Sequence, residues 1–400
     1  MSYDAPFAGL KVIDLSQGIA GPYCGMLLAQ QGAQVIKVEG PGSGDWTRIL
    51  GARYGDHTAF SIIGNLGKRG VAIDLKKPEG KAVLWRLLAG SDVFIEGFRP
   101  GVIQRLGFGY PEVSAREPKL IYLSISGFGQ TGPLAERPAM DPVLQAFTGL
   151  TAENHGQDGI PHRVPVIPVD MATALYAFAG LSSALYARDS NRREHGESKG
   201  RYLDASLMQG AAGLQAIRMM SAYLEGGTVR PGSAPHGIFK TADGWVSITT
   251  IREHEWLGLC KALEQPAMAI DERFATSALR IQHEHELMTQ LRTIIEPMPS
   301  AVLTQRLAQA DVMHERVNRY VDFLKEPQVV QTQAVAWLSQ PDVPQAVPVG
   351  NLPGVTAFRD GTPQATSPRV GQHTASVLKE HGYDDTQIAA LAANGVIDLG

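Results

Sequence analysis

The sequence predicts an α/β fold, in which a Rossmann-like parallel sheet forms a large domain and a smaller α+β domain follows it. Short apolar runs alternate with helical patterns from residue 10 to residue 126, a spacing typical of parallel sheets. A chain of 400 residues exceeds what one hydrophobic core usually serves, so two domains are expected. A glycine- and proline-rich stretch at 226–237 marks the boundary between them.

The first part of the chain contains apolar or β-branched runs that predict buried strands. They cover residues 10–16, 33–39, 70–75, 91–98 and 119–126. The helices expected between them cover about 22–31, 78–88, a short segment carrying Arg105, and 111–117. Ligands of parallel sheets bind at the carboxyl ends of the strands, which places Glu39, Lys76, Arg99 and the glycines of 127–132 at the binding edge. Residues 45–64 show no clear pattern.

The second part begins with helix starts near Asp141 and Asp170, and the charged stretch 189–200 predicts an exposed turn after the second helix. The small domain opens with a hairpin around Asp243-Gly244. The remaining expected elements are a strand at 201–204, a helix to about 223, and helices at about 253–263, 282–295, 300–309, 372–381 and 384–394.

The composition argues against several classes of function. With 36 basic and 40 acidic residues the net charge is −4, which disfavours a nucleic-acid-binding protein but leaves room for a small anionic ligand. The N-terminal residues lack a basic segment followed by an apolar one, and no apolar run approaches the roughly 18 residues of a membrane span. The two cysteines, Cys24 and Cys260, form no disulfide framework. We therefore expect a soluble, cytoplasmic protein without nucleic-acid or membrane partners.

Several common catalytic motifs are missing from the sequence. The turn Gly18–Pro22 with Glu39 imitates a dinucleotide-binding unit, but its glycine spacing differs from that fingerprint. Gly67-Lys68-Arg69 is not a P-loop, and Ser124–Gly129 lacks the serine-hydrolase pattern. Neighbouring positions in His283–Glu286 do not share a helix face, so no metal site is expected.

Basic residues lie at or near the expected strand ends in the first third of the chain. Each alone is explained as a surface charge, whereas together, beside glycine turns and helix starts, they could hold a phosphorylated ligand. These residues are Lys37, Lys68, Lys76, Arg99 and Arg105. The residues alone leave both interpretations open.

A single carboxylate, Asp170, opens an otherwise apolar helix after Pro165 and Pro168, and the next acidic residue is Asp189. One interpretation is a helix cap, in which the carboxylate accepts hydrogen bonds from the exposed amides at the positive end of the helix dipole. The other is a partly desolvated, ionised nucleophile. Both interpretations are compatible with the residues alone.

Several blocks of residues follow one another in a specific order along nearly the whole chain. They are Leu15–Pro22, Gly32–Glu39 with Gly42–Asp45, Asn65–Arg69 with Asp74–Lys76, Asp92–Gly101 with Arg105–Phe108, Ile121–Gly132, the Asp170 helix, and Arg369–Thr374 through Gly382-Tyr383. In this order they resemble the signatures of class III (CaiB/BaiF-type) CoA-transferases, including the formyl-CoA:oxalate type. No single block identifies the family, but this many blocks in the same order along the chain are specific to it.

The resemblance implies a large domain built from both chain ends and an interlocked homodimer, whose two subunits thread through each other as rings. On this basis residues 1–190 form the large CoA-binding α/β domain, and 191–225 form a linker strand and helix. Residues 226–325 form the small α+β domain. Residues 326–400 form the return linker and the C-terminal part of the large domain.

The resemblance also implies a bound CoA thioester as substrate, at the sheet ends of the large domain, and no metal. By position, the adenine and phosphate groups would contact Ile73, Asp74, Leu75, Lys76, Arg99 and Arg105. The rest of the expected CoA-binding set comprises Ile19, Ala20, Gly97, Phe98, Met140 and Asp141. The catalytic aspartate of the family falls on Asp170.

On this resemblance, Asp170 attacks an acyl-CoA, forms an acyl-aspartyl anhydride and then an aspartyl-CoA thioester, and passes CoA to a small free carboxylic acid. The helix-end amides are expected to keep Asp170 ionised and to stabilise developing oxyanions. The alternatives are an α-methylacyl-CoA racemase and a non-catalytic CoA-binding dimer. Similar racemases pair the aspartate with a histidine where this chain has Met140, which favours transfer.

Two departures from the family pattern leave the substrates open. Gly97 stands where the family has an asparagine, and the long glycine loop of oxalate-type members is reduced to a short one near Gly226. A dicarboxylate acceptor or a succinyl-CoA donor is therefore an alternative to the formyl-CoA and oxalate pair. The sequence does not decide whether Asp141 or the loop near Gly226 takes part in catalysis.

Overall fold

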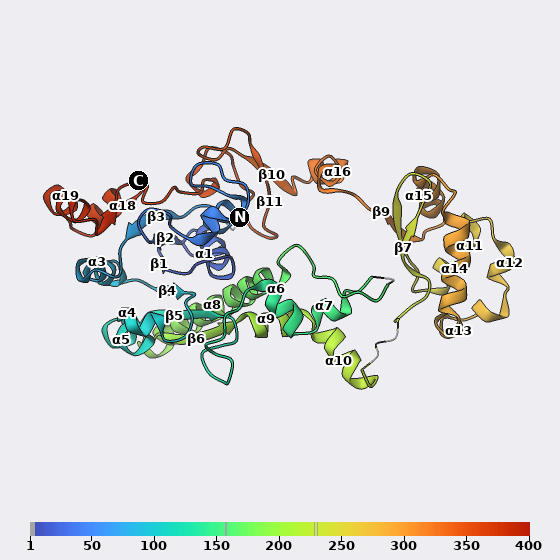
Figure 1. Cartoon of the computed structure of the whole chain (residues 1–400), viewed down its shortest axis with the longest axis horizontal. Coiled ribbons are helices and arrows are strands. Elements are labelled where there is room, and N and C mark those ends of the chain that lie inside the picture. The colour runs from blue at the N-terminus through green and yellow to red at the C-terminus, as the bar shows by residue number, and fades with distance from the viewer. Residues whose placement is uncertain (1–4, 157, 228, 230) are drawn as a thin grey trace. The chain divides into compact units, whose positions relative to one another are not determined.

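The computed structural model describes residues 5–156, 158–227, 229 and 231–400. The chain divides into two compact units (Figure 1). The first unit contains the chain up to Ala216 together with Gln331–Gly400, and the second contains Ile217–Val330. Residues from both ends of the sequence therefore build the first unit, and the second is one continuous stretch.

The described part of the first unit contains a sheet of seven strands in the order β12-β3-β2-β1-β4-β5-β6. Their bounds are β1 (Lys11–Asp14), β2 (Gln34–Glu39), β3 (Arg69–Ile73), β4 (Val93–Glu96), β5 (Ile121–Ser126), β6 (Arg201–Ser206) and β12 (Ile397–Asp398). All neighbours run parallel except β12, which pairs antiparallel with β3. The order 3-2-1-4-5-6 is that of doubly wound folds, which confirms the predicted parallel sheet.

Helices connect and cover these strands. The helices before the second unit are α1 (Ala20–Gln30), α2 (Ala59–Asn65), α3 (Pro78–Leu88), α4 (Val102–Leu106), α5 (Tyr110–Arg116), α6 (Asp141–Phe147), α7 (Leu150–Glu153), α8 (Pro168–His195) and α9 (Leu207–Leu214), with a 3₁₀ turn, η1 (Trp46–Ile49). Helix α10 (Ala216–Leu224) starts at the last residue of this stretch and continues into the second unit. Later in the chain lie β10 (Val335–Leu338), β11 (Val347–Gly350), the 3₁₀ turn η3 (Pro363–Ala365), α18 (Thr374–Glu380) and α19 (Asp385–Ala393). Strands β10 and β11 form an antiparallel pair.

Both faces of the seven-stranded sheet are buried, because successive side chains of a strand point to opposite faces. Val12 and Leu123 belong to a core that includes residues of α1 and α8. Their neighbours Ile13 and Tyr122 belong to the other core, which includes residues of α3, α18 and α19. Burial on both faces explains why the strands read as continuous apolar runs rather than as an alternating pattern.

Two segments differ from the sequence prediction. The exposed turn predicted from residue 189 is wrong at its start, because α8 continues through the charged residues to His195 and ends at Gly196, where φ is +72°. The unpatterned segment 45–64 contains η1 and α2. Helix α2 begins with a capping box, in which Thr58 and Ser61 exchange side-chain and backbone hydrogen bonds.

In the described part of the second unit, β7 (His236–Lys240), β8 (Trp245–Thr249) and β9 (Met313–Arg316) form an antiparallel sheet. The helices are α11 (Glu253–Ala262), α12 (Pro266–Ala269), α13 (Ser277–Gln282), α14 (Glu284–Ile295), α15 (Ser300–Gln309), α16 (Tyr320–Phe323) and α17 (Pro327–Gln331), with a 3₁₀ turn, η2 (Glu272–Phe274). Phe239, Trp256 and Leu291 lie in its core. The predicted hairpin around Asp243-Gly244 is confirmed, since β7 and β8 pair antiparallel on either side of this turn.

Across the described ranges, no helix combines the length and the apolar character that a membrane crossing requires.

Candidate active site

The strand order of the large sheet reverses between β1 and β4, and ligands of doubly wound sheets bind in the crevice at such a point. A pocket of about 170 Å³ lies at this place. Asp170 lines it together with segments that follow β1, β4 and β5. The lining residues are Gln17, Gly18, Ile19, Ala20, Gly21, Trp46, Gly97, Ile125, Ser126, Gly127, Ala139, Met140, Asp170 and Leu207.

A second cavity of about 370 Å³ shares Ile19, Trp46, Met140 and Asp170 with this pocket. Its other walls are mostly apolar. They consist of Leu50, Gly51, Phe60, Asp141, Pro142, Gln145, Arg163, Val164, Pro165 and Ile167. Asp170 therefore lines two spaces of different character that share part of their walls.

Asp170 is the third residue of α8, but a different side chain caps this helix. The carboxylate of Asp141 accepts hydrogen bonds from the backbone N–H groups of Val169 (2.7 Å) and Asp170 (3.1 Å). The residue before the helix, Ile167, has φ +44° and ψ +53°, a left-handed conformation that is strained for a β-branched side chain. Strain of this kind persists only where the surroundings enforce it, and here it sets the direction in which α8 begins.

The carboxylate of Asp170 itself accepts no hydrogen bond from any residue that the structure describes, and its side chain is partly buried. Burial raises the pKa of Asp170 to about 7, and the negative charge of Asp141 adds to the effect. The expectation that the helix-end amides keep Asp170 ionised is therefore wrong. The same amides are not free to stabilise an oxyanion, because Asp141 already uses them.

Gln145 holds Asp141 in place from the next turn of α6. Its amide nitrogen donates to Asp141 Oδ1 (2.5 Å) and to the carbonyl oxygen of Val164 (2.9 Å). Its amide oxygen accepts from the backbone N–H of Val164 (2.8 Å). The buried Gln145 thus ties together the capping carboxylate and the loop that leads into α8.

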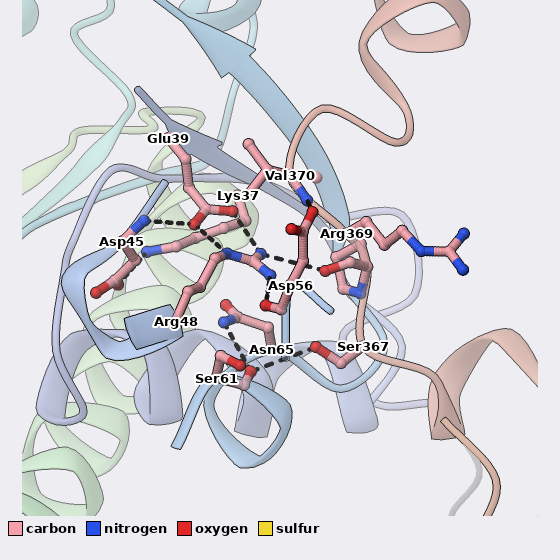
Figure 2. A network of polar contacts seen from close by, with 12 residues as sticks. Lys37, Glu39, Asp45, Arg48, Asp56, Ser61, Asn65, Ser367, Arg369 and Val370 are labelled. Atoms are coloured by element: carbon pink, nitrogen blue, oxygen red, sulfur yellow. Dashed lines mark hydrogen bonds and ion pairs between the residues drawn. The ribbon is translucent and has the colours of Figure 1, made fainter. Parts of the chain in front are cut away.

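Buried ion pairs fix the loop that carries Trp46 (Figure 2). Asp45 accepts from Lys37 Nζ (3.3 Å) and from the backbone N–H groups of Thr47 (3.0 Å) and Gly18 (3.2 Å). Gly18 lines the pocket, so Asp45 fastens the loop after β2 to the turn after β1. Trp46, the next residue, is thereby held against the pocket wall.

A bidentate ion pair joins Glu39, the last residue of β2, to Arg48 in η1. Arg48 Nε and Nη2 each lie 2.7 Å from one carboxylate oxygen of Glu39, and both side chains are buried. Arg48 also donates to the carbonyl oxygen of Asp56 (3.0 Å), as Figure 2 shows, and to that of Pro368 (3.2 Å). Hydrogen bonds therefore connect the pocket loop to the segment that follows η3.

Two of the basic residues proposed as phosphate ligands have structural partners instead. Lys68 Nζ lies 2.6 Å from Asp14 Oδ2 in a fully buried pair. Lys37 donates to the carbonyl oxygen of Ser16 and pairs with Asp45. Charged groups without access to solvent need these partners, because an unpaired buried charge is very costly. The interpretation of Lys37 and Lys68 as phosphate ligands is therefore wrong.

The other three basic residues are exposed: Lys76 and Arg99 come shortly after β3 and β4, and Arg105 lies in the last turn of α4, the helix that follows β4. None of them forms a salt bridge with another described residue. The backbone N–H of Lys76 donates to Asp74 Oδ1 (2.9 Å), which makes a tight turn after β3. Free cations beside strand ends suit a phosphorylated ligand.

The structure brings part of the predicted site together. Ile19, Ala20, Gly97, Met140 and Asp170 line the smaller pocket, and Asp141 lines the larger cavity. The remaining predicted residues line neither space: Ile73, Asp74, Leu75, Lys76, Phe98, Arg99 and Arg105.

Sequence reasoning assigned no site role to several residues that line the two spaces. They are Gln17, Gly18, Gly21, Trp46, Phe60, Ser126, Gln145 and Arg163. Gly127, which was expected at the binding edge, does line the smaller pocket. A signal existed for Gln17 and Ser126, because Gln17 comes shortly after β1 and Ser126 ends β5, both at the ligand-binding edge. Trp46 and Arg163 carried no such signal, since each belongs to a loop without a predictive pattern.

Comparisons with known proteins give one consistent result. The model of the family described as CoA-transferase family III matches residues 7–374. Human succinyl-CoA:glutarate CoA-transferase is 31% identical over 98% of this chain and 90% of its own length. Acetyl-CoA:oxalate CoA-transferase of Acetobacter aceti is 32% identical over 94% and 95%, and formyl-CoA:oxalate CoA-transferase of Shigella sonnei is 29% identical over 98% and 99%. A CaiB/BaiF family protein from Brucella suis has a crystal structure that superposes with a TM-score of 0.81, at 31% identity over 94% of this chain and 100% of that chain.

Proposed function

The chain belongs to CoA-transferase family III, and from this premise we propose that it moves CoA from an acyl-CoA to a small free carboxylic acid, with Asp170 as the nucleophile. The observation that carries this proposal is the carboxylate of Asp170, which lines the pocket at the reversal point of the sheet without any protein hydrogen bond among the described residues. A carboxylate without donors keeps its oxygen lone pairs available for attack on a thioester.

In the proposed reaction, an oxygen of Asp170 attacks the thioester carbonyl of the donor. The carbon–sulfur bond breaks, the CoA thiolate leaves, and an acyl-aspartyl anhydride remains. The thiolate then attacks the aspartyl carbonyl, which gives an aspartyl-CoA thioester and releases the first acid. The acceptor carboxylate displaces the thiolate to form a second anhydride. The thiolate attacks the acceptor's carbonyl, and the Asp170 carboxylate is regenerated.

The pKa of Asp170 fits this role. A carboxylate that is poorly solvated and repelled by Asp141 is a stronger nucleophile than one stabilised by amides, provided that it is ionised. A pKa of about 7 leaves roughly half of the side chain ionised at neutral pH. The burial of the Asp170 side chain would also limit the water that hydrolyses an anhydride or a thioester.

We assign the CoA moiety to the carboxyl edge of the large sheet. Lys76, Arg99 and Arg105 would hold the phosphates, since they are the exposed cations beside these strand ends without a salt bridge among the described residues. Ile73, Asp74 and Leu75 would lie at the adenine end, while Phe98 and Gly97 would lead toward the thioester. Ile19, Ala20, Met140 and Asp141 would contact the reacting end. CoA is a substrate here, and the chemistry needs no metal.

We further propose that the chain works as an interlocked homodimer in the cytoplasm. Helices α9 and α10 expose large apolar side chains that water does not favour, among them Leu214, Ile217, Met220, Tyr223 and Leu224. A second copy of the chain would cover them. The free, buried cysteines Cys24 and Cys260 suit a reducing compartment. In this assembly residues 1–190 with 326–400 form the CoA-binding domain, 191–225 the linker, and 226–325 the small domain.

The decisive experiment replaces Asp170 by Asn and Ala. Both variants should lose transfer by at least about a thousandfold while they still bind CoA. Hydroxylamine should trap the aspartyl-CoA thioester as a hydroxamate on Asp170 in the wild type, located by peptide mass spectrometry. Unchanged turnover in the variants would refute the mechanism.

The racemase alternative is less well supported, because exposed Met140 occupies the place of the second base. Racemisation would place solvent deuterium at the α-carbon of a 2-methylacyl-CoA, and transfer would place none. A non-catalytic CoA-binding dimer would bind CoA and give no product with any acid.

A further inference from the structure

Arg163 is the only basic residue among the described residues that line the two spaces containing Asp170. It lies in the wall of the larger cavity, in the loop just before α8. The other cations near the pocket, Lys37, Arg48 and Lys68, are buried and paired with carboxylates. Arg163 is solvent-exposed at the wall of this cavity, so its guanidinium is accessible to a ligand.

The guanidinium of Arg163 has no hydrogen bond or ion pair to any described residue. The two acidic residues of the cavity do not neutralise it. Asp141 is occupied by two backbone amides and by Gln145, and Asp170 accepts no hydrogen bond in the described structure. All five donors of the guanidinium thus remain free for a ligand.

The backbone beside Arg163 is nevertheless fixed. Val164, the next residue, exchanges two hydrogen bonds with the buried side chain of Gln145, at 2.8 and 2.9 Å. An anchored backbone with an unpaired side chain is typical of a binding residue, because the position is set before the ligand arrives.

The rest of the cavity suits a short hydrocarbon chain. Its volume of about 370 Å³ lies at the lower end of the range for small-molecule pockets, roughly 300–1,000 Å³. Ile19, Leu50, Phe60 and Ile167 supply apolar walls. A ligand that matches these walls has a carboxylate at Asp170, a few methylene groups, and an anionic group at Arg163.

We propose that Arg163 binds the distal carboxylate of a short dicarboxylate, and that it is the residue that makes this protein prefer dicarboxylic over monocarboxylic acceptors. This inference rests on the proposed transfer of CoA at Asp170. The phosphates of CoA are a less suitable partner for Arg163, because they lie at the far end of the pantetheine arm from the thioester. A planar guanidinium also matches a carboxylate in a bidentate geometry.

The test compares glutarate with valerate, two acids of equal chain length that differ in the distal carboxylate. The value of kcat/KM is measured for both acceptors with one acyl-CoA donor, in the wild type and in Arg163→Gln, Arg163→Lys and Arg193→Gln. Arg193 is an exposed arginine in the last turn of α8 and serves as the matched control for loss of charge.

In Arg163→Gln the glutarate-to-valerate ratio should fall about tenfold to a hundredfold, mostly through the KM for glutarate, as expected for loss of a charge-assisted hydrogen bond. Arg163→Lys should keep part of the preference, and Arg193→Gln should keep the wild-type ratio. An equal loss for both acids, a loss confined to the KM for acyl-CoA, or a wild type without preference for glutarate would overturn the inference.

The failure of this inference is distinguishable from failure of the proposed function. If valerate receives CoA and the ratio does not respond to Arg163→Gln, the transfer mechanism stands and the role of Arg163 is wrong. If neither these nor other acids receive CoA and no hydroxamate forms on Asp170, the proposed function itself fails.

Discussion

Asp141 Oδ2 lies 3.1 Å from the backbone nitrogen of Asp170, so one carboxylate occupies the amide that would otherwise stabilise the other. The helix dipole at the start of α8 therefore acts on Asp141, whereas Asp170 experiences burial and a neighbouring negative charge. The sequence suggested helix capping and nucleophilic attack as alternative roles for Asp170. In the structure Asp141 caps the helix, which leaves the carboxylate of Asp170 available for attack.

The first prediction concerns the pH dependence of transfer. The attacking species is the ionised form of Asp170, and its pKa is about 7. With a slow chemical step, kcat should rise with pH through about 7 and reach a plateau above pH 8, falling about tenfold per unit at low pH. Rates from pH 5.5 to 9 with one donor and acceptor test this. A flat profile across pH 5.5–7 would contradict a raised pKa.

The second prediction concerns Asp141. Replacement by Asn keeps an oxygen that can accept from the amides of α8 but removes the charge that repels an ionised Asp170. The acid limb of the pH profile should therefore move to lower pH, by on the order of half a unit to one unit. Asp141→Glu, which keeps the charge, is the control. A shift to higher pH in the Asn variant would show that Asp141 does not act through its charge.

The third prediction concerns stability. The pKa of Asp170 is raised in the folded state, so folding favours its protonated form. The stability that this preference for the protonated form provides is fully present below the pKa of Asp170 in the unfolded chain, 3.8. It is lost as the pH rises toward the folded-state pKa of about 7. Asp170→Asn should therefore be more stable than the wild type at pH 8, by on the order of 2 kcal/mol, and nearly equal to it at pH 4. Urea unfolding at both pH values measures the difference. An equal effect at both would exclude a charge-dependent cause.

The fourth prediction concerns the buried pair of Glu39 and Arg48. Glu39→Gln leaves the guanidinium buried without its counterion and should lower the free energy of unfolding by about 3–5 kcal/mol. Glu380→Gln breaks the exposed pair with Arg69 and is the control, with an expected loss below about 1 kcal/mol. Urea unfolding measures both losses. Equal losses of unfolding free energy in the two variants would show that the burial of the Glu39–Arg48 pair does not make it more important for stability than the exposed Arg69–Glu380 pair.

The fifth prediction concerns the phosphate ligands. Arg99→Gln and Arg105→Gln should each raise the KM for acyl-CoA about tenfold with a smaller change in kcat. The KM for acyl-pantetheine, which lacks the nucleotide, should not respond, and Arg193→Gln should alter neither. If acyl-pantetheine were affected as strongly as acyl-CoA, these arginines would act on something other than the phosphates.

The sequence predicted those parts of the fold whose cause is local. Strands buried on both faces are visible as apolar runs, and helices such as α3 begin at a proline and end before a glycine. Helix α2 escaped notice because a capping box of Thr58 and Ser61 is a weaker pattern than one with Glu or Gln. The charged end of α8 suggested a turn, but exposed charges do not interrupt a helix.

Prediction of the site was limited by long-range contacts. The resemblance pointed to Asp170, but nothing in the residues around it shows that Asp141, in another helix, takes its amides. Lys37 and Lys68 looked like surface cations because their partners Asp45 and Asp14 are chosen by the three-dimensional packing. The hydrogen bonds of Asp141 and the ion pairs of the two lysines all join residues that are separated in the sequence, and a single sequence does not show which separated residues will pair.

The antiparallel pairing of Ile397 with Ile73 has a consequence for the order of folding during synthesis. The core shared by α3, α18 and α19 cannot close until the ribosome has made the residues around Ile397. The second unit, a continuous stretch that is translated in between, can fold while the first still exposes an apolar sheet face. The nascent chain therefore carries a half-covered sheet while the residues between Ser206 and Ile397 are synthesised, and exposed apolar surface of this kind is prone to aggregation.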